Sequence, residues 1–301
     1  MKRITEEKDI FIPSPDGDIH AIFTGCASGW GECGYCEPEP GEKPLVVMCH
    51  GLMMHAGLNP IREMSDSFAG AGYDTLRIDF RGSGKSSGDI EDMTPLTEVA
   101  DLLHVIDHIV TCSGNAGGRK IVVCGHSLGG LVSLLASAFL HGAEVPGLGE
   151  VLARSSSGES PFRAGLDAMR ASLAGLVLLA PAVNIEADSK AGRVAYETFD
   201  PVSIPDKVEV WGSFLSRNYF LTARRLDTFN VISHYTGPAC ILMGERDRIV
   251  EMNLSDRIMK AMPGAEMHII PHGDHLFSRV SRLRAVEIAL GFLSELTKSL
   301  Q

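Results

Sequence analysis

The sequence lacks long hydrophobic runs: its 301 residues contain no uninterrupted apolar stretch of 18, so we predict no transmembrane helix. The first ten residues, MKRITEEKDI, lack the apolar segment of a secretory signal, and we therefore expect a cytoplasmic protein. Basic residues are outnumbered, with 27 Lys and Arg against 38 Asp and Glu, which gives a formal net charge of −11. This balance argues against nucleic acid and against an anionic membrane surface as partners.

Internal repeats and long low-complexity segments are also absent, and 45% of the residues are hydrophobic, which is ample for a core. Short apolar runs alternate with segments of helical spacing. This alternation predicts an α/β fold, in which a mostly parallel sheet of about eight strands carries helices on both faces. We expect one domain over residues 1–301. Predicted strands cover residues 9–14, 18–24, 44–49, 73–79, 121–124, 173–180, 236–243 and 265–271, and predicted helices cover 59–70, 94–111, the segment from the turn at 125–130 to 140, 253–262 and 281–299.

The stretch from Lys120 to Leu140 carries the most informative motif. It begins with the β-branched run IVVC, turns at GHSLGG and continues into small and apolar residues of helical composition. Gly125, Ser127 and Gly129 form the pattern Gly-x-Ser-x-Gly, which between a strand and a helix is a nucleophile elbow. The turn pushes the serine hydroxyl out above the sheet edge, and the small flanking residues let strand and helix pass. Ser127 is therefore the candidate nucleophile.

A serine hydroxyl needs a base within hydrogen-bond reach, and the base needs an orienting carboxylate. Both are expected after the serine in the chain, just past the ends of late strands. Asp247 follows the strand CILM and is the best-placed acid, with Glu245 as the substitute. His275 follows the strand MHII and is the best-placed base, with His272 as its competitor.

The attack of such a serine creates an oxyanion, which needs backbone donors held in place. One predicted donor is the N–H of Leu128, the residue after the nucleophile. The other is expected in the loop after the strand PLVVMC, where Leu52 is the first choice and Met53 the second. His50 in the same loop is interpreted as a structural residue that shapes the loop. This chemistry requires no cofactor.

Gly84-Lys85-Ser86 has the ending of a phosphate-binding P-loop. The complete motif requires a glycine five residues before Gly84, and that position is Asp79. The segment also follows a later strand instead of the opening strand of the sheet. Nucleotide binding is therefore not expected here.

Seven cysteines are present, an odd number. Cys26, Cys33 and Cys36 gather in one loop, whose CxxC pair is half of a zinc-knuckle pattern without a matching second pair. A closed metal site would have to recruit His20 or His55, so free thiols, a disulfide and a metal site all stay open, and no metal is assigned. The remaining cysteines are interpreted as three core residues and one near a helix end: Cys49, Cys124, Cys240 and Cys112.

With these residues in place, the chain resembles the serine α/β-hydrolases and, more narrowly, the bacterial feruloyl (cinnamoyl) esterases. The likeness is carried by segments spread through most of the chain: His50-Gly51, 79–88 with Met93-Thr94, 125–130, 178–182, Asp200-Pro201, 204–206 and 273–278. The resemblance implies a small cap over the carboxyl edge of the sheet, at about residues 181–234. Two further insertions, at about 25–43 and 141–172, depart from the family pattern. They could reshape the pocket rim or form an oligomer contact such as that of a homodimer.

The resemblance also implies a small-molecule ester substrate, in which a hydroxycinnamate is joined to a plant cell-wall sugar or quinate. Asp188 falls where the family has a cap aspartate that meets the ring hydroxyl, and Leu215 stands where the family has a tyrosine with a similar role. The leading interpretation is ester hydrolysis through an acyl-enzyme. The alternatives are a lipase or monoacylglycerol-type esterase, an aminopeptidase-like hydrolase, an acyltransferase, and a catalytically silent binding protein.

Overall fold

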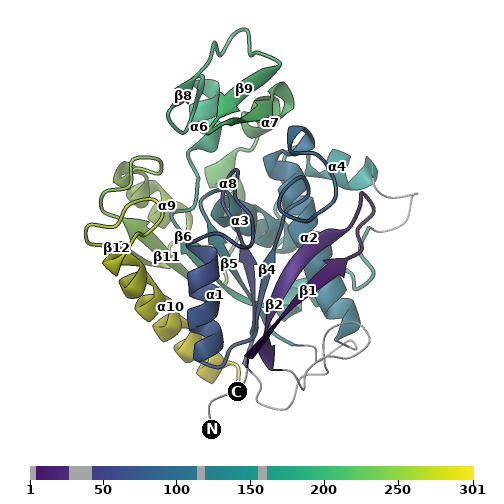
Figure 1. Cartoon of the computed structure of the whole chain (residues 1–301), viewed down its shortest axis with the longest axis vertical. Helices are drawn as coiled ribbons and strands as arrows, with labels where there is room; N and C mark the ends of the chain where they lie inside the picture. The colour runs from purple at the N-terminus through teal and green to yellow at the C-terminus, as the bar shows by residue number, and fades with distance from the viewer. Residues whose placement is uncertain (1–4, 27–42, 114–118, 155–160) are drawn as a thin grey trace.

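A computed structural model describes residues 5–26, 43–113, 119–154 and 161–301 (Figure 1). Its centre is an eight-stranded sheet in the order β1-β2-β4-β3-β5-β6-β11-β12. β1 and β2 are antiparallel to their neighbours, and every pair from β4 to β12 is parallel, which confirms the expected mostly parallel sheet. The strands are β1 (Thr5–Ile12), β2 (Ile19–Cys26), β3 (Leu45–Cys49), β4 (Thr75–Ile78), β5 (Ile121–His126), β6 (Leu173–Leu179), β11 (Ala239–Gly244) and β12 (Glu266–Ile270).

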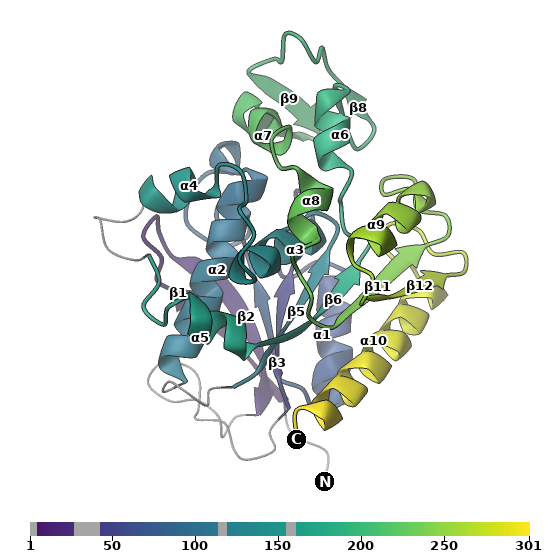
Figure 2. The same cartoon turned by 180° about the vertical axis from the view of Figure 1, so that it is seen from behind.

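Helices cover both faces of this sheet, as expected. α1 and α10 lie on one face, and α2, α3 and α8 lie on the other (Figures 1 and 2). The inner strands β3, β5 and β11 are buried along their whole length because they are covered on both sides, which explains their continuous apolar sequences. The helices around the sheet are α1 (Ile61–Gly70), α2 (Pro95–Cys112), α3 (Leu128–Leu140), α8 (Thr228–Ile232), α9 (Ser255–Ala261) and α10 (Val280–Ser299).

Helix α2 shows how local sequence sets an element's start. The Thr94 side chain accepts a hydrogen bond from the backbone N–H of Thr97, and the Thr97 hydroxyl accepts one from the N–H of Thr94, forming a capping box. Pro95 occupies the first helical position, where its missing N–H costs nothing. Among the helices of the described residues, none combines the length and apolar character needed to cross a bilayer.

Residues 185–223 rise above the carboxyl ends of the parallel strands as a small cap (Figure 1). The cap contains two short antiparallel hairpins. In the larger hairpin, Lys207-Val208-Glu209-Val210 alternates exposed and buried side chains. Its turn, Trp211-Gly212, has φ of 52° and 80°, the two positive values that a tight two-residue turn requires. The cap elements are α6 (Ile185–Lys190), β7 (Arg193–Val194), β8 (Glu197–Thr198), β9 (Lys207–Val210), β10 (Ser213–Ser216) and α7 (Arg217–Ala223).

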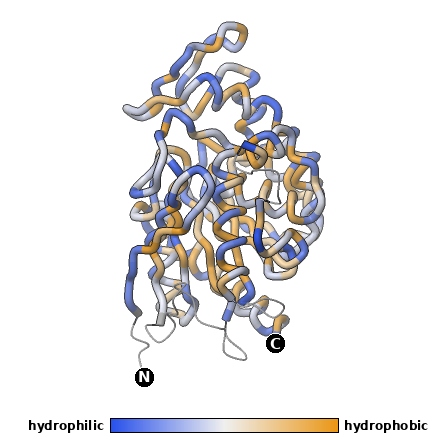
Figure 3. Tube along the Cα trace, turned by 90° about the vertical axis from the view of Figure 1, so that its right-hand side faces the viewer, coloured by the Kyte–Doolittle hydropathy of each residue, from blue (hydrophilic) through white to orange (hydrophobic). Residues whose placement is uncertain are grey.

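The other two insertions are described only in part. Residues 141–172 contain the short helices α4 (Leu148–Arg154) and α5 (Leu166–Ser172). Cys33 and Cys36 lie outside the described residues, as does the side chain of Cys26 at the end of β2. Figure 3 shows the hydrophobic segments concentrated in the body beneath the cap, where the parallel strands run.

Glycine is required where α3 passes the end of β3. A Cβ atom on Gly129 would lie 2.6 Å from the carbonyl oxygen of Cys49 and closer still to that of His50. We expect Gly129→Ala to lower the free energy of unfolding by about 3 kcal/mol, because two backbone segments would have to separate. Gly291→Ala in α10 is the matched control, since no heavy atom lies within 4 Å of the added carbon.

That control should raise the free energy of unfolding by about 1 kcal/mol, through helix propensity alone. Urea titration of both variants makes the comparison. Equal unfolding free energies for the two variants would contradict the proposed close packing at Gly129.

Candidate active site

Three predicted side chains meet at the carboxyl edge of the sheet. His275 Nε2 lies 2.8 Å from Ser127 Oγ, and His275 Nδ1 lies 2.8 Å from Asp247 Oδ2. Ser127 follows β5, Asp247 follows β11 and His275 follows β12, so the ends of three parallel strands deliver them. The Asp247 side chain is fully buried, and that of His275 is 11% exposed. The arrangement is a continuous chain of hydrogen bonds from a carboxylate to a hydroxyl.

Ser127 occupies the strained turn that its motif predicts. Its φ of 54° and ψ of −118° lie outside the regions that non-glycine residues ordinarily adopt. The surroundings hold this conformation: the Ser127 N–H donates to the Leu179 carbonyl, and the Ser127 carbonyl accepts from Gly130 and Ala182. Gly125 permits the close approach, because a Cβ there would lie 2.5 Å from Ser133 Oγ. The strain is therefore locked in by strand β6 and the first turn of α3.

The Asp247 carboxylate determines which nitrogen of His275 carries hydrogen. Oδ1 accepts from the N–H groups of Ile249 and Val250, at 2.8 Å and 3.0 Å, which leaves Oδ2 for the imidazole. A carboxylate only accepts, so His275 Nδ1 donates to it. Nε2 therefore presents its lone pair to the hydroxyl of Ser127, the orientation that proton abstraction requires.

The two substitute candidates lie away from Ser127 and face each other. Glu245 Oε2 accepts from the backbone N–H of His272 at 2.7 Å and lies 3.3 Å from His272 Nδ1. Both side chains are more than half exposed. The structure thus groups Asp247 and His275 with the serine, and pairs Glu245 with His272 on the surface.

Two backbone N–H groups next to Ser127 are free to bind negative charge. Among the hydrogen bonds of the described residues, none uses the N–H of Leu52 or of Leu128. Leu128 opens α3, whose N-terminus carries partial positive charge. Leu52, Ser127 and Leu128 line the same small pocket. Met53, the second choice, has a φ of 57° and lines the adjoining cleft.

His50 holds the start of this loop, as expected for a structural residue. Its Nδ1 donates to the Gly51 carbonyl at 2.9 Å, and its Nε2 accepts from the Phe80 N–H at 3.1 Å. Burial lowers the pKa of His50 to about 4, although the Gly51 carbonyl and Asp79 act in the opposite direction. The ring therefore stays neutral, with a fixed tautomer, near neutral pH.

Asp79 is a second anchor for the loop. Its Oδ1 accepts from the Ala56 N–H at 2.6 Å, while its Oδ2 accepts from the Lys85 N–H at 2.9 Å and lies 2.7 Å from His20 Nδ1. Gly84, with φ of 54°, leaves no room for a Cβ beside this carboxylate. The segment Gly84-Lys85-Ser86, which has the ending of a P-loop, therefore packs around the carboxylate of Asp79. His20 has both ring nitrogens engaged, because Nε2 bonds Asp9, so it is not free to serve the cysteine loop.

His126 is a structural residue beside the site that the sequence analysis missed. Its Nε2 donates to the backbone carbonyl of His275 at 2.8 Å, across 149 residues of chain. Burial, together with the neighbouring His275 ring, lowers the pKa of His126 to about 3, so the ring is neutral. It ties the elbow to the loop that carries the base. Only its position inside the Gly-x-Ser-x-Gly motif could have drawn attention to it.

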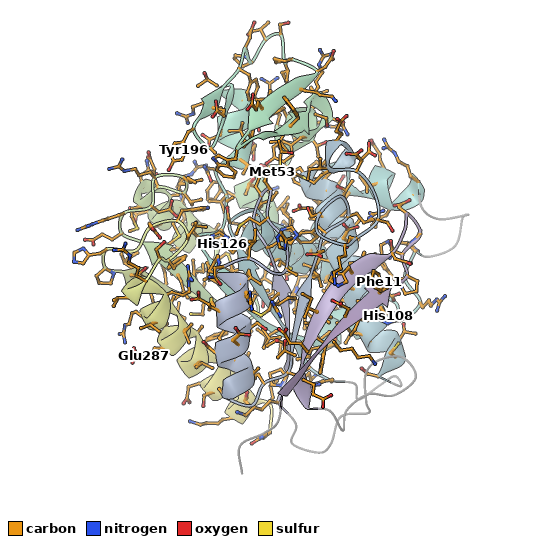
Figure 4. The ribbon with its side chains drawn as sticks, viewed as in Figure 1. Phe11, Met53, His108, His126, Tyr196 and Glu287 are labelled. Carbon is orange, nitrogen blue, oxygen red and sulfur yellow. The ribbon has the colours of Figure 1, made fainter. Side chains whose placement is uncertain are left out.

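Two cavities meet at Ser127. The larger is a cleft of about 960 Å³ between the body and the cap. Figure 4 shows Met53 and Tyr196, which line it, at the junction of the two parts, above His126. The smaller is a side pocket of about 40 Å³ under the cap. The cleft is lined mainly by Leu52, Met53, Met54, His55, Ile90, Tyr196, Trp211, Arg246, Arg248, Ile249, Asp274 and Leu276.

The two cap residues singled out from sequence lie in different places. Asp188 lines the side pocket, where its carboxylate accepts from Asn184 Nδ2 and from Arg193 Nη2, each at 2.6 Å. Leu215 is fully buried in β10 and is not among the residues that line either cavity. Tyr219, in α7, lines the side pocket with Asp188. Leu215 thus fills the cap's own core, whereas Tyr219, four residues later, lines the side pocket.

The neutral state of His50 makes stability depend on pH. Its pKa of about 4 in the folded protein lies below the ordinary value of about 6.5. Between these two pH values the imidazole is protonated in the unfolded chain and neutral in the folded chain. We expect the free energy of unfolding to fall by about 2 kcal/mol from this residue between pH 7 and pH 5. His50→Gln should remove that loss. The exposed His234→Gln is the control, and urea titrations of the three proteins at both pH values test the prediction.

Comparing the proteins cancels the opposing effect of Asp101, whose pKa is raised to about 6, mainly by burial. An unchanged pH dependence in His50→Gln would show that the prediction is wrong.

Comparisons with known proteins identify the family and support the fold. Residues 46–286 match the family described as Alpha/beta hydrolase family. A monoacylglycerol lipase of Mycolicibacterium smegmatis is 23% identical over 243 residues, which cover 77% of this chain and 80% of that protein. A monoglyceride lipase homolog of monkeypox virus is 29% identical over 108 residues, which cover 35% of this chain and 37% of that protein.

Among solved structures, Est1E from Butyrivibrio proteoclasticus with bound ferulic acid superposes with a TM-score of 0.73. It is 24% identical, and the match covers 95% of this chain and 99% of that one. The likeness to Est1E concerns the fold, whereas the family match spans most of the sequence. The chain therefore belongs to the alpha/beta hydrolase family.

Proposed function

We propose that the protein is a serine carboxylic ester hydrolase that works through an acyl-enzyme. The observation that carries the proposal is the hydrogen-bonded series from Asp247 through His275 to Ser127, with 2.8 Å at each step. Membership of the alpha/beta hydrolase family supports it. The similarity to a monoacylglycerol lipase and the fold shared with Est1E also support it.

In the first half-reaction, His275 Nε2 takes the hydroxyl proton as Ser127 Oγ attacks the ester carbonyl. Asp247 stabilises the imidazolium that forms, and the N–H groups of Leu52 and Leu128 receive the carbonyl oxygen as it becomes negative. Collapse of this intermediate expels the alcohol, which takes the proton from His275. In the second half-reaction, water attacks the acyl-enzyme as His275 takes its proton. His275 then returns this proton to Ser127 Oγ, which releases the acid and regenerates the serine.

The two cavities suggest how the ester lies. The acyl group would enter the side pocket near Asp188 and Tyr219, and the alcohol would occupy the large cleft. At about 40 Å³ the side pocket fits a short acyl group, and an aromatic ring would require the cap to shift. We propose small aromatic acyl groups, such as hydroxycinnamates, and short aliphatic ones as the substrate class. Ferulic acid in Est1E supports the aromatic choice.

A lipase-like activity on monoacylglycerols is the second candidate. The cleft carries an apolar wall of Leu52, Met53, Met54, Ile90 and Leu276, which suits a fatty acyl chain. The similarity to the mycobacterial monoacylglycerol lipase also favours it. An aminopeptidase-like hydrolase and an acyltransferase would use the same acyl-enzyme and differ only in the leaving group or the final acceptor.

The nucleophile is tested with Ser127→Ala. We expect kcat/KM for p-nitrophenyl butyrate to fall at least about 10³-fold, because no other hydroxyl faces His275 Nε2 among the described residues. A fluorophosphonate probe should label the wild-type protein and leave this variant unlabelled. Ser233→Ala, at an exposed serine of the body, is the control and should keep full activity. Undiminished turnover by Ser127→Ala would falsify the proposal.

The acyl subsite is tested with Tyr219→Phe, which removes only the buried hydroxyl. For methyl ferulate we expect KM to rise about threefold to tenfold, the effect of one lost hydrogen bond. Methyl cinnamate has no ring hydroxyl, so its KM should stay unchanged. Monoolein and aminoacyl anilides in the same panel distinguish the other candidates. An equal change for both methyl esters would assign Tyr219 to the cap's packing instead.

A further inference from the structure

A cluster of three possible metal ligands lies at the opposite end of the sheet from Ser127. Cys240 is the second residue of β11, and Glu266 is the first residue of β12. The parallel register pairs Cys240 with Glu266 and Leu242 with His268, so all three polar side chains share one face of the sheet. The thiol sulfur, a carboxylate oxygen and an imidazole nitrogen all lie within 4.8 Å of one another. The cluster thus brings three different donor types together at an edge strand.

The side chain of His268 has a buried nitrogen without a hydrogen-bond partner in the described part of the chain, as expected for a ligand of an empty metal site. Its side chain is 38% exposed, yet Nε2 is buried and makes no hydrogen bond within the described part of the chain. Nε2 lies 3.4 Å from Glu266 Oε1, outside hydrogen-bond geometry. Buried polar atoms are almost always paired in folded proteins, so an orphaned nitrogen aimed at a carboxylate and a thiol needs an explanation.

We propose that Cys240, Glu266 and His268 bind a divalent transition-metal ion of the Zn²⁺ class. Thiolate and imidazole are ligands that Zn²⁺ prefers over Ca²⁺ or Mg²⁺, and a carboxylate completes a common three-residue set. Water would take the fourth position. Ligand bonds of about 2.0–2.3 Å place neighbouring donor atoms about 3.3–3.8 Å apart in a tetrahedral site. The separation of His268 from Glu266 already meets this range.

Binding requires the thiol to lose its proton. Burial raises the pKa of Cys240, and the nearby Glu266 raises it further, so the thiol is protonated in the empty site. The arriving cation displaces this proton to solvent and takes the thiolate as its ligand. The Glu266 side chain is 50% exposed, so the cluster lies next to solvent at the edge of the sheet.

The ion would fasten the edge strand β12 to its neighbour β11. These strands end in the loops that carry His275 and Asp247, at the far side of the sheet. The expected effect is on metal content and thermal stability, and the test does not depend on the proposed ester hydrolysis.

The test uses the full-length protein with Cys26, Cys33 and Cys36 replaced by serine, because these loop cysteines are competing thiols. After chelator treatment the protein is titrated with Co²⁺, a spectroscopic substitute for Zn²⁺. We expect one equivalent to bind with a near-ultraviolet thiolate-to-cobalt charge-transfer band, and equimolar Zn²⁺ to abolish the band and raise Tm. Cys240→Ser should lose the band, and His268→Ala should raise the Kd at least about tenfold.

Cys112→Ser is the matched control, because the Cys112 sulfur also lies near a histidine nitrogen, that of His108, at 3.6 Å. This variant should keep the band. Circular dichroism checks that each variant folds, and His268→Ala, at a partly exposed edge position, decides the question if Cys240→Ser does not fold. No band, a band that persists in Cys240→Ser, an unchanged Kd in His268→Ala, or weak binding that every variant shares would overturn the proposal as an adventitious ion only.

Discussion

The close passage of β3, β5 and α3 beneath Ser127 is the constraint on which the site depends. Gly129 lies against the carbonyl groups of Cys49 and His50, so the first turn of α3 touches the start of the loop that carries Leu52. One contact therefore positions both the serine and the N–H groups beside it. The positive φ of Ser127 is maintained because its own N–H and carbonyl are bonded to β6 and to the residues after it. Backbone packing, more than side-chain choice, sets the geometry of the reaction centre.

The buried histidines and the buried carboxylates around Ser127 form different kinds of contact. His50 and His126 are buried and uncharged, and each joins backbone segments without adding a cation beside His275. Asp79 is charged and fully occupied by donors, chiefly the backbone N–H groups of Ala56 and Lys85, and these lower its pKa although burial acts in the opposite direction. Asp247 is then the carboxylate that faces the imidazole. This separation would confine the proposed proton transfer to one histidine and one serine.

Much of this could be predicted because the informative residues are local to strand ends. The alternation of apolar runs indicated the sheet, and the residues just after the runs at 121–124, 236–243 and 265–271 include Ser127, Asp247 and His275. The hydrogen bond from His126 to the His275 carbonyl was not predictable, because it depends on the meeting of the end of β5 with a loop 149 residues later. The Cys240, Glu266 and His268 cluster depends on strand register in the same way.

The cap was the least predictable part, and size explains why. Its strands are two to four residues long, too short for a period of two to stand out from chance. Whether Leu215 or Tyr219 faces the pocket depends on how the small hairpin and α7 pack against each other. Sequence spacing does not contain that information, whereas the turn at Trp211-Gly212 could have been read from the glycine alone.

The position of β12 has a consequence for when the protein becomes competent. It is the last strand in the chain and the outermost strand of the sheet, and the loop after it supplies His275. During synthesis the proposed nucleophile, Ser127, and its turn can form well before the proposed base, His275, has been made. In the proposed mechanism, a nascent chain that lacks β12 would thus hold an inert serine, and ester hydrolysis would begin only after this strand docks.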